Sequence, residues 1–155
     1  METFLAGLEA TGLADWLRGS RWGYAGVNAA HILGIALLVG AIAPLDLRLL
    51  GAYRSVPVAT LARVLVPVAA SGLALAVATG ATLFSVRASE YAALDVLRAK
   101  LVLVILGTGA ALALHATAGR WLMGASPARL AGHGALSLSC WLGALVLGRL
   151  IAFAE

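Results

Sequence analysis

Four long apolar segments constrain this chain more than any other feature of its sequence. They cover about residues 23–44, 57–84, 97–119 and 129–153, and charged or turn-forming residues separate them. A helix that crosses a bilayer needs roughly 20 mainly apolar residues, and each segment reaches that length. The sequence therefore predicts an all-α integral membrane protein, with a four-helix transmembrane bundle formed by residues 21–155.

The composition agrees with a membrane location and excludes several other classes. Of the 155 residues, 62% are hydrophobic and 12% are charged, which is far from the mixture found in soluble domains. The net charge of +4 comes from bases that flank the apolar segments, so it indicates contact with lipid headgroups and no nucleic-acid partner. Four crossings leave no room for a separate catalytic domain, which favours a non-catalytic subunit.

The first 20 residues carry a different pattern. Phe4, Leu8 and Trp16 recur at helical spacing, while Glu9 and Asp15 fall on other faces. This pattern is typical of an amphipathic helix that lies along the membrane surface. An ordinary amphipathic packing helix is an equally good interpretation.

Rows of small residues indicate where the helices approach one another. One row is Gly72, Ala76 and Gly80, and another is Gly107, Ala111, His115 and Gly119. Small side chains let membrane helices come into backbone contact, so we expect both rows to face neighbouring helices.

Few groups at lipid depth can carry chemistry. If the first crossing ends at Pro44, Asp46 lies outside it, and no acidic residue remains within a span. The candidates are then His31, His115, His133 and Cys140. Because proton pumps and ion-coupled carriers commonly use buried carboxyls, this set argues against both.

The three histidines favour a b-type haem held inside the bundle. His31 is followed one turn later by Gly34, which leaves space for a flat group, and His115 belongs to a small-residue row. Histidines on separate helices are suitable axial ligands for haem iron. Arginines at one membrane face would pair with the haem propionates, and these are Arg48, Arg54, Arg63, Arg120 and Arg129.

Two histidine pairs remain possible at this point. His31 and His115 suit diagonal helices but differ in depth by roughly 12 Å, whereas His115 and His133 differ by about 6 Å but belong to adjacent helices. Either pair predicts an electron-transfer subunit or redox relay. The alternatives are a cofactor-free assembly or transport component, in which the histidines only make hydrogen bonds, and a transition-metal site at His31, His115 and Cys140.

The order of several motifs resembles a known group of membrane proteins. His31, Gly34 and the run Asp46-Leu47-Arg48-Leu49-Leu50-Gly51 are followed by Thr79-Gly80, Phe84 and Lys100. This order resembles a family of small bacterial four-span inner-membrane proteins of unassigned activity, and the intramembrane histidines are more loosely similar to those of small b-type membrane cytochromes. The resemblance implies a bacterial inner membrane. The expected partners are a redox protein or a quinone, and a homo-oligomer or a larger membrane complex.

The basic residues give only a weak preference for one orientation of the chain in the membrane. An even number of crossings places both termini on one side, and lysines and arginines divide almost evenly between the two faces. The slight excess on the side of the termini favours cytoplasmic termini.

Overall fold

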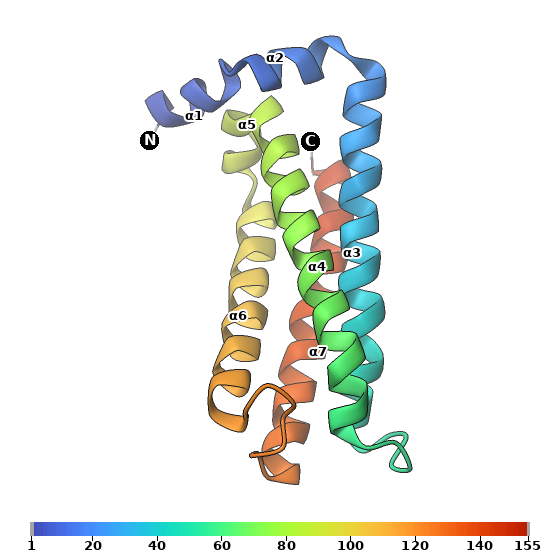
Figure 1. Cartoon of the computed structure of the whole chain (residues 1–155). Helices are drawn as coiled ribbons and strands as arrows, with labels where there is room; N and C mark the ends of the chain where they lie inside the picture. Colours follow the sequence, from blue (N-terminus) through green and yellow to red (C-terminus); the bar gives the residue numbers. More distant parts are fainter. Residues whose placement is uncertain (1, 155) are drawn as a thin grey trace.

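The computed structural model describes residues 2–154 and consists of helices, with no strand among these residues. Four long helices run side by side as an elongated bundle (Figure 1). They are α3 (Arg21–Leu49), α4 (Val58–Val86), α6 (Asp95–Ala118) and α7 (Pro127–Leu150). Each is long and apolar enough to cross a membrane. The predicted all-α transmembrane bundle is confirmed, and the chain is a multi-pass membrane protein.

Short helices lie across one end of this bundle. α1 (Glu2–Glu9) and α2 (Gly12–Gly19) extend over the end at which α5 (Ala88–Ala93) joins α4 to α6, and the short 3-10 helix η1 (Ile151–Phe153) follows α7 (Figure 1). The single helix expected over residues 1–20 is therefore two helices.

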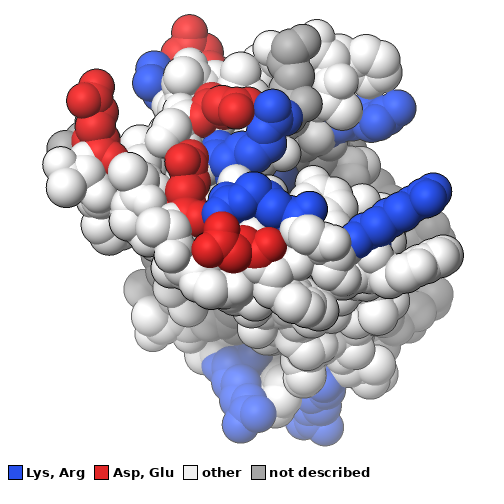
Figure 2. All heavy atoms as spheres, turned by 90° about the horizontal axis from the view of Figure 1, so that it is seen from above, with Lys and Arg blue, Asp and Glu red and all other residues white. Residues whose placement is uncertain are grey.

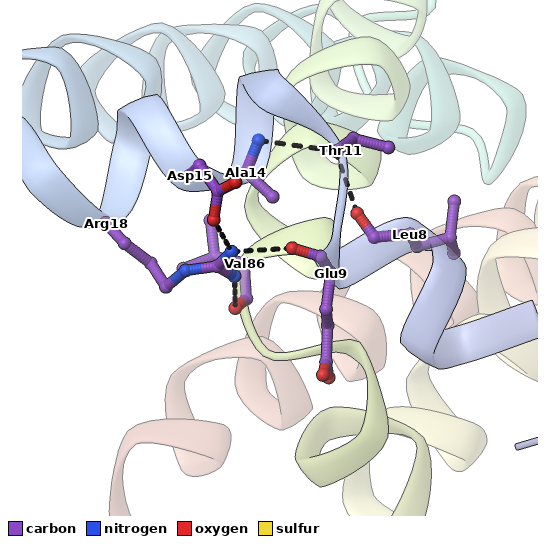
Figure 3. A network of polar contacts seen from close by, with 7 residues as sticks. All are labelled: Leu8, Glu9, Thr11, Ala14, Asp15, Arg18 and Val86. Carbon is purple, nitrogen blue, oxygen red and sulfur yellow. Dashed lines mark hydrogen bonds and ion pairs between the residues drawn. The ribbon is translucent and has the colours of Figure 1, made fainter. Parts of the chain in front are cut away.

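Thr11 explains the break between α1 and α2. Its hydroxyl donates a hydrogen bond to the Leu8 carbonyl at 2.8 Å and accepts one from the Ala14 amide at 3.3 Å (Figure 3). A threonine in this position ends one helix and caps the next.

The first crossing is longer than the sequence suggested. α3 continues through Pro44 to Leu49 because a proline removes only one amide donor, while the apolar spacing of Leu38, Leu45 and Leu49 continues and all three side chains are buried. The expectation that Asp46 lies outside the crossing is wrong, because Asp46 is a buried residue of this helix.

α3 and α4 form the tightest helix pair. A Cβ atom placed on Gly34 would lie 2.6 Å from the Ala76 amide nitrogen, and one placed on Gly72 would lie 2.5 Å from the Leu38 nitrogen. The two backbones thus touch through these glycines, as the small-residue row on α4 predicted.

α6 and α7 form a second pair, and α3 joins it to the first by packing on α7. A Cβ atom placed on Gly107 of α6 would lie 3.1 Å from the Trp141 ring of α7, so this member of the second small-residue row faces a neighbour, whereas Gly119 at the end of the row is exposed. α4 and α6 lack a comparably close backbone contact, and their side chains meet in a buried cluster that includes Ala62 of α4 and Leu114 of α6. The bundle is therefore two close helix pairs with a looser seam between α4 and α6.

A polar network holds the short helices on the bundle. The Arg18 guanidinium pairs with Asp15 and donates hydrogen bonds to the backbone carbonyls of Glu9 and Val86, the latter at 3.0 Å (Figure 3). The Glu9 carboxylate accepts a hydrogen bond from the Ser89 amide at 2.7 Å. The network therefore ties α1 and α2 to the corner between α4 and α5.

The two ends of the bundle differ in charge. Acidic and basic side chains alternate over the end covered by the short helices (Figure 2), where Arg87 pairs with Glu90 and Arg98 with Asp95. The opposite end carries five arginines, and among the described residues its only acid is the buried Asp46. The five are Arg48, Arg54, Arg63, Arg120 and Arg129.

Glu9 makes the attachment of α1 sensitive to pH. The Ser89 amide holds the pKa of the Glu9 carboxyl below its ordinary value because it stabilises the ionised form. The stabilisation is present above the ordinary carboxyl pKa and is lost as the pH falls through the lowered pKa. We expect the protection factor of the Ser89 amide, its exchange rate relative to an unprotected amide at the same pH, to fall in that acidic range, and Glu9→Gln to remove this fall. A protection factor that changes with pH equally in both proteins would contradict the assignment.

Candidate functional site

A cavity of about 200 Å³ lies among the long helices, in the half of the bundle remote from the N-terminal helices. All four long helices line it, mostly with apolar side chains. Its polar lining consists of Asp46, Thr108, His115, His133, Ser137 and Trp141. This is the place where the chain concentrates ionisable and hydrogen-bonding groups inside the membrane, so it is the candidate site.

Asp46 is the most constrained polar group of the cavity. Its exposed fraction is 3%, and within residues 2–154 its Oδ2 atom has no hydrogen-bond partner. The Ser137 hydroxyl lies beside the carboxyl. α7 packs closely on α3 at this level because Gly134 has no side chain. A Cβ atom at Gly134 would lie 2.9 Å from the Asp46 carbonyl oxygen.

His115 and His133 bring two imidazoles to the same cavity. His115 lies on α6 and His133 on α7, and both side chains are half-buried. The two rings are close enough to interact electrostatically, and Arg129 lies near His133. The structure thus brings together one of the two predicted histidine pairs and adds a carboxyl to it.

Trp141 supplies the remaining unusual group. The ring is 4% exposed and packs against Gly107, yet its Nε1–H has no acceptor among the described residues. A buried indole N–H ordinarily has a hydrogen-bond partner. The cavity therefore contains an unpaired donor at Trp141 and an unpaired oxygen at Asp46.

A hydrophobic cluster closes the cavity at the arginine-rich end. Leu49, Leu114 and Leu122 are buried together there, and Leu122 adopts a left-handed backbone with φ of 62° that turns the loop inward. Such a backbone costs leucine about 1–2 kcal/mol, which the burial of its side chain offsets.

His31 and Gly34 lie outside this cavity. His31 Nδ1 is 2.9 Å from the Ala76 carbonyl oxygen and 3.1 Å from the Thr79 hydroxyl, so the ring is held on α4. At 1.5 Å per residue, His31 is about 22 Å from Asp46 along α3. The space beside Gly34, which the sequence suggested for a flat group, is filled by the α4 backbone.

We expect His31 to act in packing. His31→Ala should lower stability by roughly 0.6 kcal/mol, the average value of a hydrogen bond between membrane helices. Denaturation of the variant in mixed micelles measures the change. A loss of stability several times larger would contradict a role limited to these hydrogen bonds.

The arginines expected near a haem have protein partners. Arg48 donates from Nε to the Val56 carbonyl at 2.6 Å, Arg120 and Arg63 lie over the Trp121 ring at 4.8 and 5.8 Å, and Arg129 donates to Thr117. None of these side chains lines the cavity. Their arrangement organises the loops at this end of the bundle.

The residues of a three-ligand metal site are not brought together. His31 and the buried Cys140 are absent from the cavity lining. Over residues 2–154, no three His, Cys, Asp or Glu side chains are grouped for metal binding.

Sequence reasoning missed Asp46, Ser137 and Trp141 as parts of the site. Asp46 had a usable signal, because it follows Leu38 by eight residues and Ile42 by four, on the buried face of a continuous helix. The position of Trp141 opposite Gly107 depends on the relative register of two helices, which periodicity does not give.

Comparisons of this chain with protein-family models, with curated proteins and with solved structures find no match. The resemblance to a bacterial four-span family therefore stays a prediction.

Proposed function

We propose that this membrane protein binds and releases protons at Asp46, His115 and His133, as a proton-exchanging component of a transport or redox assembly. The observation that carries the proposal is the Asp46 carboxyl, which is buried with an unpaired Oδ2 in a cavity that it shares with two imidazoles. Carboxyl and imidazole groups inside membrane bundles commonly belong to proton or ion pathways.

The surroundings of Asp46 favour reversible binding of a proton and do not provide a permanent ion pair. α6 contributes His115 and α7 contributes His133, whereas the residues that α4 places in the cavity are all apolar. No basic side chain within the described chain forms an ion pair with Asp46. Leaving a charged carboxyl buried without a partner costs several kcal/mol, so a proton, water or ligand is expected to complete this site.

Infrared difference spectroscopy of the protein in lipid nanodiscs tests this proposal. Between about pH 4 and pH 10, which covers carboxyl and imidazole titration, we expect a carboxyl C=O band that Asp46→Asn removes. Asp95→Asn is the matched control, because that side chain is 91% exposed. A spectrum unchanged by Asp46→Asn would overturn the proposal.

A second candidate is the b-type haem electron-transfer subunit predicted from the sequence. It is favoured by His115 and His133, which line one largely apolar cavity from two helices. The cavity of about 200 Å³ lies below the roughly 300–1,000 Å³ of most ligand pockets, so α4 and α6 would have to separate to admit a haem. Haem-supplemented protein without a Soret band would exclude this candidate, and a low-spin spectrum abolished by His115→Ala would establish it.

A further inference from the structure

Two buried side chains that line the cavity leave hydrogen-bonding atoms without a partner among the described residues. The oxygen of Asp46 and the indole N–H of Trp141 both lack a partner, and both side chains are more than nine-tenths buried. One group that donates and another that accepts would satisfy both atoms. His115 and His133 add nitrogens that donate or accept according to their protonation.

The cavity opens toward lipid through the seam between α4 and α6. These two helices lack the close contact that joins the other neighbours. Ala70 and Leu112 line the cavity from opposite sides of the seam and are also exposed, Leu112 by 66%. Because both positions lie within long apolar helices, the opening faces the hydrocarbon of the bilayer.

The lining restricts which lipid-soluble molecules fit. No lysine or arginine lines the cavity, and Asp46 disfavours a second anion, so fatty-acid and phosphate headgroups are poor ligands. A volume of about 200 Å³ admits only a small polar head, while an attached chain would leave through the seam. Three aromatic side chains, Trp141, His115 and His133, are among the lining residues, which favours a ring-shaped ligand.

We propose that the cavity binds the ring of a neutral, lipid-soluble quinol, which enters from the bilayer between α4 and α6 and hydrogen-bonds to Asp46 and Trp141. This inference deepens the proposed function and rests on the same site, since a ligand oxygen at Asp46 is placed to share a proton with the carboxyl. The quinol hydroxyl donates to Asp46, and a ring oxygen accepts from the Trp141 Nε1–H.

Calorimetric titration of the full chain in nanodiscs with decylubiquinol tests the inference. We expect saturable binding that Trp141→Phe weakens about tenfold, because this variant removes the N–H donor and retains an aromatic ring. Asp46→Asn should weaken binding by a similar factor. Ala111→Leu fills the cavity and should abolish binding, whereas Ala113→Leu, an exposed position on the same helix outside the cavity, should leave it unchanged.

Three outcomes would overturn the inference. If decylubiquinol does not bind the wild-type protein, the cavity holds only water. Equal binding by wild-type, Trp141→Phe and Ala111→Leu proteins would mean partition into the lipid. Decanoate that binds as tightly as decylubiquinol would exclude selection for a neutral ring. The infrared titration is made without ligand, so the two proposals can fail separately. If Asp46 gives the expected carboxyl band but decylubiquinol does not bind, this inference is wrong and the proposed function stands.

Discussion

Gly34→Ala is expected to destabilise the bundle by about 1–3 kcal/mol or more, although alanine is the better helix former. The added methyl group would lie 2.6 Å from the Ala76 nitrogen and 2.9 Å from the Gly72 carbonyl oxygen. Both are backbone atoms and cannot rotate away, so α3 and α4 would have to separate. Denaturation in mixed micelles, followed by circular dichroism, measures the change.

Gly40 is the matched control on the same helix. A Cβ atom at Gly40 would meet nothing within 4 Å, so Gly40→Ala should be neutral or should stabilise the protein by up to about 1 kcal/mol. Opposite signs for the two substitutions are the expected result. If both variants were stabilised equally, α3 and α4 would not be in backbone contact at Gly34.

Trp141→Ala is expected to cost about 3–5 kcal/mol, the range for removal of a large aromatic side chain from a core. The ring is 4% exposed and fills the space against Gly107, and its loss would enlarge the neighbouring cavity. Unfolding in the same micelles measures the effect. Trp141→Phe should cost far less, because the lost N–H has no partner to begin with.

Trp22 provides the comparison for this prediction. Its side chain is 83% exposed near the end of α3, so Trp22→Ala should change the stability of the protein by less than about 0.5 kcal/mol. A similar loss of stability in both variants would contradict the position of Trp141 in the core.

The sequence predicted the parts of the fold that local pattern determines. Long apolar runs identified the four crossings, and the spacing of Gly72 and Gly80 identified a face of α4 that packs on α3. The end of the first crossing was misplaced because Pro44 is a common helix terminator. In this chain the buried spacing of Leu45 and Leu49 maintains the helix beyond it.

The candidate site was only partly predictable because its members come from several helices. His115 and His133 were recognised as rare polar residues in apolar segments, and they line one cavity. His31 lies away from that cavity because the rotational setting of α3 turns its ring toward α4. There its Nδ1 atom contacts the Ala76 carbonyl and the Thr79 hydroxyl. Helix rotation and register depend on tertiary packing, which one sequence does not specify.

Thiol accessibility at position 46 tests the central claim most directly. In a Cys140→Ser background, Asp46→Cys places a thiol inside the bundle, and Ser55→Cys places one in the exposed loop between α3 and α4. A membrane-impermeant maleimide should label the thiol at position 55 rapidly and the thiol at position 46 only after denaturation. Equal labelling of both positions in the folded protein would place Asp46 in the loop and contradict the buried site.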